Sequence, residues 1–203
     1  MADGAFGRDQ VASVHIPPIP EQVRRGEALQ DRVRALLPTL AANAGKAEAE
    51  RKVPEENIRL LREAGFTRAL QPLAYGGLEL SPEQYCPLIV DIAGACASTA
   101  WVAGLLAQHG HGLALMSKAV QDEVWADPEA LLSSSVAPIN EGKAVDGGVI
   151  LSGRFGWSSG CDHAQWACLG FRKAVPELGG MMLPFYAVVP RKEVQIKPLI
   201  SGI

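Results

Sequence analysis

The sequence predicts an α+β protein in which helices and strands occupy separate stretches of the chain. Apolar residues recur with helical spacing between residues 21 and 127. From residue 128 to residue 203 come short runs rich in valine, isoleucine and aromatic residues, divided by glycine and proline. Residues 1–20 are polar and end in Ile-Pro-Pro-Ile-Pro, which fits a flexible arm. We therefore expect an arm, an all-helical domain and a β-domain, in that order.

The first helix is expected to begin at Glu21 and to continue to about residue 44. Pro38 should kink this helix or divide it in two, because proline lacks a backbone N–H and its ring clashes with the preceding turn. The next helix should start at Pro54, and Gly65 is placed to cap its end. The apolar positions that support the first helix are Val23, Leu29, Val33, Leu36, Leu37, Leu40 and Ala44.

A second group of helices is expected after the loop that follows Gly65. Ser81 and Gln84 have the spacing of a capping box, with proline directly after the serine. Three helices should follow, at about 82–96, 99–116 and 118–126. The stretch 92–117 lacks charged residues but contains serine, threonine, glutamine and histidine, so it favours buried helices over a membrane span.

The β-domain should contain a hairpin and several further strands. Residues 144–145 and 149–151 flank Asp-Gly-Gly, which predicts a tight turn. The other expected strands are 131–137, 154–158, 164–171, 184–190 and 194–199.

Composition excludes several classes of protein. The 203 residues are 48% hydrophobic and 20% charged with a net charge of −3, which is ordinary for a globular protein and too acidic for a nucleic-acid scaffold. The four cysteines contain no C-x-x-C pair and are too sparse for a disulfide framework. No signal-peptide pattern opens the chain. A cytoplasmic location follows as the simplest expectation.

Residues 153–166 are the densest candidate site. Glycines and two serines stand between aromatic residues, so the backbone can approach a flat ligand closely. The hydroxyls of Ser158 and Ser159 could bind the polar edge of a ring system, while Trp157 or Trp166 covers its face. A wide turn with the aromatic residues facing the core is the alternative, and the residues alone leave both open.

Two further patterns suggest other chemistry. Residues 156–160 match G-x-S-x-G, but a serine hydrolase needs a helix after this motif and a histidine downstream, and no histidine follows His163. His109 and His111, two residues apart on a helix, point about 200° from each other and cannot share a metal ion. No metal site is expected. His109 alone is either a hydrogen-bonded core histidine or an acid–base group facing a pocket.

With these motifs, the chain resembles the flavin-dependent aromatic monooxygenases, the oxygenase components of two-component hydroxylases built on the acyl-CoA dehydrogenase fold. The resemblance covers roughly residues 25–200, and S-G-C-D-H-A is its most specific part. The segments that carry it are V-P-E-E-N-I-R-L-L-R-E-A-G-F (53–66), Y-G-G-L-E-L-S-P-E-Q (75–84), A-S-T-A-W-V-A (97–103) and D-G-G-V-I-L-S-G-R-F-G-W-S-S-G-C-D-H-A-Q-W (146–166).

The resemblance implies a helical N-terminal domain, an antiparallel β-barrel or sandwich, and reduced FMN or FAD supplied by a separate flavin reductase. It places Ser159 beside the reactive nitrogen of the flavin, where its hydroxyl can hold a flavin hydroperoxide. Trp157 and Ser158 would supply neighbouring flavin contacts. His109, or His111 if the alignment shifts, would position a small aromatic substrate and stabilise its ionised phenol.

The resemblance also implies a departure. Members of the family continue into a C-terminal helical bundle that completes the flavin pocket and forms the core of a homotetramer. This chain stops at Ile203, so we expect an incomplete β-domain, doubtful assembly and no activity of the chain alone. Two alternatives remain: a fragment of the acyl-CoA dehydrogenase type, and a catalytically dead remnant that binds flavin or a partner chain. Ser133-Ser134-Ser135 stands where the dehydrogenases carry a T-E-P-type strand, which favours the monooxygenase.

Overall fold

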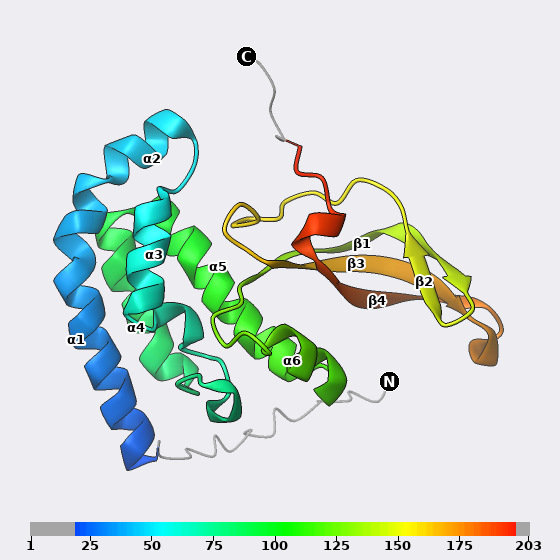
Figure 1. The fold of residues 1–203 in the computed structure, drawn as a ribbon, viewed down its shortest axis with the longest axis horizontal. Helices are drawn as coiled ribbons and strands as arrows, with labels where there is room; N and C mark the ends of the chain where they lie inside the picture. Colours follow the sequence, from blue (N-terminus) through cyan, green and yellow to red (C-terminus); the bar gives the residue numbers. More distant parts are fainter. Residues whose placement is uncertain (1–18, 198–203) are drawn as a thin grey trace, which may run out of the picture.

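A computed structural model describes residues 19–197. The helices lie at one end of the molecule and the sheet forms the other end (Figure 1). The helices are α1 (Pro20–Ala42), α2 (Ala44–Glu50), α3 (Glu55–Glu63), α4 (Pro82–Ala95), α5 (Ala97–Ala114) and α6 (Lys118–Val124). Short 3-10 turns cover Phe66–Arg68, Leu73–Tyr75, Pro176–Leu178 and Arg191–Glu193. The predicted helices are all present, and α2 is an additional helix that the sequence pattern does not predict.

Four strands form one curled sheet with the order β2-β1-β3-β4. They are β1 (Leu132–Val145), β2 (Gly148–Leu151), β3 (Trp166–Val175) and β4 (Met181–Pro190). The α+β class is confirmed, but the sheet is mixed and not purely antiparallel, because β1 and β3 run parallel. The two other pairings are antiparallel. The connection from β2 back to β3 makes this parallel pairing possible, and it carries the candidate site.

The ends of the helices follow local sequence signals, with one exception. Ser81 and Gln84 form the predicted capping box at the start of α4. Gly65 follows α3 with a φ of 86°, a conformation that suits glycine. Pro38, in contrast, does not divide α1, which continues to Ala42 and breaks only at Asn43. One missing hydrogen bond is tolerated there because the buried face of α1 packs against α4.

Two of the predicted strands need correction. The hairpin between β1 and β2 is confirmed, with Val145 paired to Gly148 across Asp146 and Gly147. Residues 154–158 are irregular, as are residues 194–197 of the predicted strand 194–199; the end of that strand lies outside the described residues. Trp157, within the first segment, has a φ of 62°, and Gly153, directly before this segment, has a φ of 144°; an extended strand contains neither value.

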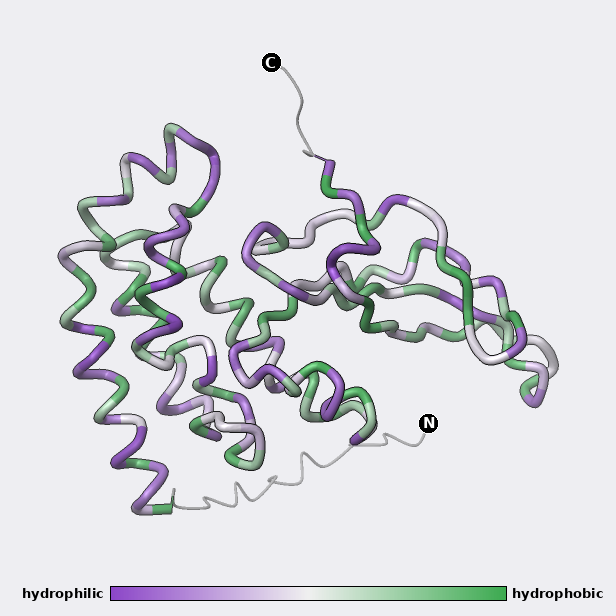
Figure 2. The backbone as a smooth tube through the Cα atoms, in the orientation of Figure 1, coloured by the Kyte–Doolittle hydropathy of each residue, from purple (hydrophilic) through white to green (hydrophobic). Residues whose placement is uncertain are grey.

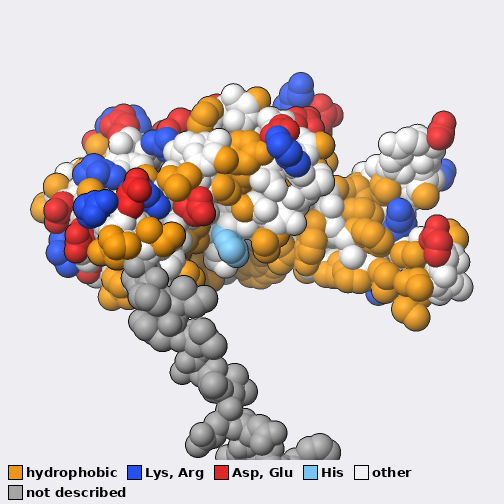
Figure 3. Space-filling model, turned by 90° about the horizontal axis from the view of Figure 1, so that it is seen from below, with side chains coloured by type: hydrophobic (Ala, Val, Ile, Leu, Met, Phe, Trp, Pro, Cys, Tyr) orange, Lys and Arg blue, Asp and Glu red, His pale blue; other side chains and the backbone are white. Residues whose placement is uncertain are grey.

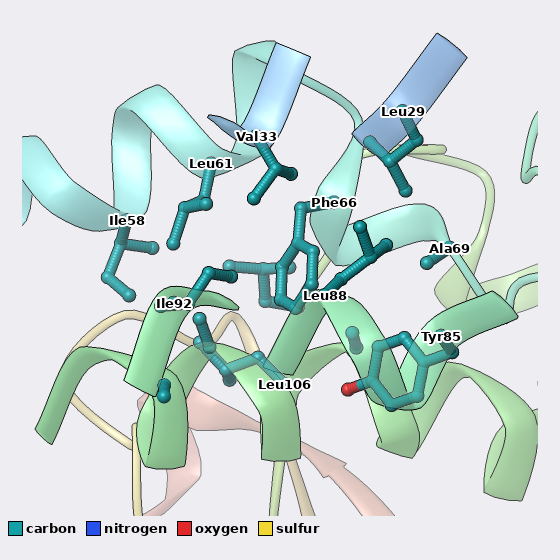
Figure 4. Packing of buried hydrophobic residues seen from close by; sticks show 14 of the residues in the cluster. Leu29, Val33, Ile58, Leu61, Phe66, Ala69, Tyr85, Leu88, Ile92 and Leu106 are labelled. Atoms are coloured by element: carbon teal, nitrogen blue, oxygen red, sulfur yellow. The ribbon is translucent and has the colours of Figure 1, made fainter. Parts of the chain in front are cut away.

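The principal core lies between α1, α3, α4 and α5. Leu29, Phe66, Leu88 and Ile92 are fully or almost fully buried there (Figure 4). Helix α1 alternates between hydrophilic and hydrophobic residues, as a helix with one buried face should (Figure 2). Leu131, next to β1, belongs to the same core. The first residues of the sheet are thus packed directly onto the helices.

The surface of the sheet is rich in hydrophobic side chains, which form a band along the face seen in Figure 3. Val136, Ile139, Ile150 and Tyr186 are each more than half exposed. None of the helices within residues 19–197 is both long enough and apolar enough to cross a bilayer. Helix α6 ends at Val124 and β1 begins at Leu132. The domain boundary at residues 127/128 and the arm at residues 1–20, of which residues 1–18 lie outside the described part, remain predictions.

Candidate functional site

The connection between β2 and β3 forms a tight turn against α5. The N–H of Cys161 donates to the carbonyl of Ser158 over 3.1 Å, and the N–H of His163 donates to that of Gly160 over 2.9 Å. Gly160 has a φ of 79°, and a Cβ there would lie 3.1 Å from Leu106 of α5. The turn Ser158–Gly160 therefore depends on glycine both for its conformation and for its close approach to the helix.

His163 fixes the far side of this turn to the helical region. Its side chain is buried, and Nδ1 lies 2.8 Å from a carboxylate oxygen of Glu55, in the first turn of α3. A carboxylate only accepts, so Nδ1 of His163 carries the proton and donates it. The most specific motif of the sequence, S-G-C-D-H-A, thus contains most of the turn and the side chain that anchors it.

One face of α5 approaches β1 and the turn. Trp101, Leu105 and His109 are spaced by four residues, so they lie along this face. Together with Ser134 and Ser159 they line a pocket of about 650 Å³ between the helix, β1 and the turn. The remaining lining residues are Val136, Ala137, Gly156 and Trp157.

His109 bridges α5 and β1 through both ring nitrogens. Nδ1 lies 2.6 Å from the carbonyl oxygen of Leu132, and Nε2 lies 2.7 Å from the hydroxyl of Ser134. The carbonyl can only accept, so Nδ1 carries the proton and Nε2 accepts from Ser134. Burial lowers the pKa of His109 from its ordinary value, although the Leu132 carbonyl partly opposes this shift. The imidazole is therefore neutral near pH 7.

The serines of the site pair with one another and with the helix. The hydroxyl of Ser158 donates to that of Ser133 on β1 over 3.1 Å. The hydroxyl of Ser159 accepts from the indole Nε1 of Trp101 over 3.2 Å. Ser135 donates to the carbonyl of Gly156 over 2.6 Å. The three consecutive serines of β1 therefore have different partners. Ser133 and Ser135 hydrogen-bond to the loop, and Ser134 hydrogen-bonds to His109.

The structure brings three of the four predicted site residues to one pocket. His109, Trp157 and Ser159 line it, whereas Ser158 lines an adjoining pocket of about 330 Å³ together with Ser133. Trp157 is 82% exposed, so it does not face the core. Trp166 packs against a separate core cluster and lines neither of these two pockets. The roles predicted for these residues are not decided by this geometry.

Ser134 and Trp101 form hydrogen bonds in this pocket, and the sequence predicts neither of them as a site residue. Ser134 meets His109 only because β1 starts beside α5, and no local pattern marks this contact. The A-S-T-A-W-V-A segment contains Trp101, but its spacing of eight residues from His109 was the only signal for a shared helix face.

The geometry supports neither a serine hydrolase nor a metal ion shared by His109 and His111. Residues 156–160 lie in an irregular segment followed by a turn and β3, not between a strand and a helix as a nucleophile elbow requires. His111 is exposed while His109 is turned toward β1. Across residues 19–197, no group of three potential metal-binding side chains comes together.

Comparison with known proteins agrees with the fold and the motifs. Residues 24–127 match the acyl-CoA dehydrogenase N-terminal domain family. The chain is 46% identical to the oxygenase component of p-hydroxyphenylacetate 3-hydroxylase from Acinetobacter baumannii, over 84% of this chain and 40% of the relative. It is 44% identical to the oxygenase subunit HsaA of a flavin-dependent monooxygenase from Rhodococcus jostii, over 68% of this chain and 37% of the relative.

A solved structure of a related hydroxylase has the same fold. The crystal structure of 3-HSA hydroxylase from Rhodococcus sp. RHA1 superposes with a TM-score of 0.79 at 38% identity, covering 84% of this chain and 44% of the other. The chain belongs to the acyl-CoA dehydrogenase N-terminal domain family. Within that family its relatives are oxygenase components of flavin-dependent monooxygenases, as the sequence motifs predict. The chain spans about 40% of the length of the first of these relatives.

Proposed function

We propose that this chain forms part of the active site of a reduced-flavin-dependent hydroxylase that acts on small phenols. The observation that carries this proposal is the pocket that Trp157 and Ser159 share with the His109–Ser134 pair. One part of the pocket offers hydrogen-bond donors to a flat ring system, and the other offers a hydroxyl and a neutral imidazole to a phenol. The names of relatives support both the flavin part and the phenol part of this proposal.

The donor set of the turn fits a flavin. Within the described chain, the backbone N–H groups of Ser158 and Ser159 have no protein acceptor. They stand beside a serine hydroxyl and the exposed ring of Trp157. A flavin has carbonyl and nitrogen acceptors along one edge and a large apolar face, which these groups match. When bound in its reduced form, FMN or FAD activates oxygen and supplies the electrons of hydroxylation.

Ser134 and His109 can hold and accept the proton of a phenol. Because Ser134 donates to Nε2 of His109, its oxygen still has a lone pair for the phenol O–H. When the phenol ionises, its proton passes to the Ser134 oxygen as the serine proton moves to Nε2. Burial disfavours the resulting imidazolium, but the adjacent phenolate offsets this cost by its opposite charge. An ionised phenol is the more electron-rich form of the ring.

The remaining partners follow from this chemistry. We propose that a separate flavin reductase supplies the reduced flavin, as the description "oxygenase component" of the A. baumannii relative suggests. We propose a cytoplasmic location, and the four cysteines, all free in the structure, support a reducing compartment.

Equilibrium binding under anaerobic conditions tests the proposed function. The chain is titrated with reduced FMN and reduced FAD, and then, with flavin present, with a phenol and its methyl ether. We expect flavin binding, a preference for the free phenol, and loss of this preference in Ser134→Ala. His111→Gln, an exposed position of the same helix, is the matched control.

Two outcomes would overturn the proposal. If neither flavin binds, the turn is not a flavin site and the reading as a dead remnant gains support. If flavin binds but an acyl-CoA thioester binds more tightly than any phenol, the acyl-CoA dehydrogenase alternative is favoured.

A further inference from the structure

Trp101 meets the predicted flavin contact Ser159 across the junction between α5 and the turn. Its indole Nε1–H donates a hydrogen bond to the Ser159 hydroxyl over 3.2 Å. We propose that Trp101 is a positioning residue that orients the hydroxyl of Ser159 toward the ligand in the pocket. This inference rests on the proposed function, because it takes the ligand at Ser159 to be a flavin.

The chemistry of the two groups sets the direction of the effect. An indole N–H can only donate, so the Ser159 oxygen uses a lone pair to accept it. Within the described residues this oxygen makes no other hydrogen bond. Its own proton is therefore available to an acceptor on the ligand. Without the indole N–H, the hydroxyl can rotate among its three staggered positions and is no longer held in one of them.

Trp101 and Ser159 also form a wall between two pockets. Both line the pocket of about 650 Å³ that contains His109. Both also line a second pocket of about 680 Å³, bounded by Arg51 and Lys52 between α2 and α3. Trp101→Ala would remove this wall together with the hydrogen bond. Trp101→Phe keeps an aromatic ring in place and removes only the N–H donor, so it is the informative change.

The bond should affect ligand binding more than folding. Trp101 is 64% exposed, so water competes for the indole N–H in the free chain. A ligand that covers the pocket excludes this water, and a hydrogen bond is stronger when water is excluded. We therefore expect little change in the melting temperature of Trp101→Phe and a loss of about 3- to 10-fold in affinity for reduced flavin, the range of one hydrogen bond.

A spectroscopic measurement tests the bond in the chain without ligand. In a ¹H–¹⁵N spectrum, the indole resonance that disappears in Trp101→Phe is that of Trp101. Ser159→Ala should shift this resonance, and the matched variant Ser158→Ala should shift it less, since Ser158 pairs with Ser133 instead. Equal shifts in the two serine variants would overturn the inference.

A double-mutant cycle tests whether Trp101 acts through Ser159. Anaerobic titration with reduced FMN and reduced FAD is carried out on the wild type, Trp101→Phe, Ser159→Ala and the double variant. We expect Trp101→Phe to weaken binding about 3- to 10-fold alone and less than about 2-fold when Ser159 is already alanine. Trp166→Phe, which removes an indole N–H outside the site, is the control.

The outcomes separate this inference from the proposed function. If flavin binds and Trp101→Phe weakens flavin binding by the same factor in the wild type and in Ser159→Ala, Trp101 does not act through Ser159. The inference then fails while the proposed function stands. If no variant binds flavin, both fail.

Discussion

At the scale of single residues, the partners of His109 decide its chemistry. The Leu132 carbonyl fixes the proton on Nδ1, and Ser134 occupies Nε2. The sequence left two readings open for this histidine, a core residue or an acid–base group. The geometry is compatible with both, because the ring is largely buried and hydrogen-bonded at both nitrogens while it lines a pocket. Its use with a phenol remains our proposal.

The titration of His109 should be measurable in the stability of the chain. Burial lowers its pKa in the folded state, so below neutrality the unfolded chain, with an ordinary pKa of about 6.5, binds more protons. The free energy of unfolding should therefore fall as the pH decreases from about 7.5 to about 5.5. His109→Gln should flatten this dependence in urea denaturation series, with His111→Gln as the control. A slope equal to that of the wild type would contradict the assigned cause.

At the scale of elements, the turn depends on contacts that are distant in sequence. His163 ties it to α3 through Glu55, 108 residues away. Gly160 lets it approach α5. The glycines, serines and aromatic residues of this segment mark it as unusual in the sequence. The strand predicted for residues 154–158 is nevertheless wrong. Trp157 has a positive φ, and no sequence signal predicts a positive φ at a residue other than glycine.

Removing the anchor of His163 should destabilise the junction. Glu55→Ala leaves the buried Nδ1–H without its acceptor, which should cost about 1–2 kcal/mol of unfolding free energy. Glu63→Ala, which removes only an exposed pair with Arg59 on the same helix, should cost less than about 1 kcal/mol. Urea unfolding of both variants makes the comparison. Equal losses would show that the His163 contact adds no more than a surface ion pair.

The shape of β1 depends on a glycine of its neighbour. Ser135 pairs with Leu169 and Asn140 pairs with Phe171, so residues 136–139 form an irregularity opposite Gly170. A Cβ on Gly170 would lie 2.3 Å from the carbonyl oxygen of Val136, which lines the pocket. The close approach of this part of β1 to β3 is therefore possible only with glycine at position 170.

Gly170→Ala should consequently destabilise the sheet by about 1–3 kcal/mol, because the backbone of β1 has to move. Gly148→Ala is the matched strand control, since a Cβ there meets nothing within 4 Å. Thermal unfolding of the two variants tests the difference. A Gly170→Ala variant as stable as Gly148→Ala would show that the close approach imposes no constraint.

At the scale of the whole molecule, the junction of helices and sheet is where we propose the functional site. Local signals such as the Ser81 capping box and the Asp146-Gly147 turn are sufficient to predict most helices and the hairpin. They could not predict the parallel pairing of β1 with β3 or the contact of Ser134 with His109. Both depend on how distant segments pack, and no residue pattern within either segment encodes that packing.

The most direct test of our central claim, that this junction is a flavin site, is backbone hydrogen exchange of the chain with and without reduced flavin under anaerobic conditions. Binding at the junction should slow exchange in residues 156–163 and at the start of β1, where the amides of Ser158 and Ser159 gain acceptors. Exchange in α1, at the end of the molecule opposite the sheet (Figure 1), should not change. Protection that is absent from residues 156–163, or confined to other segments, would contradict the claim.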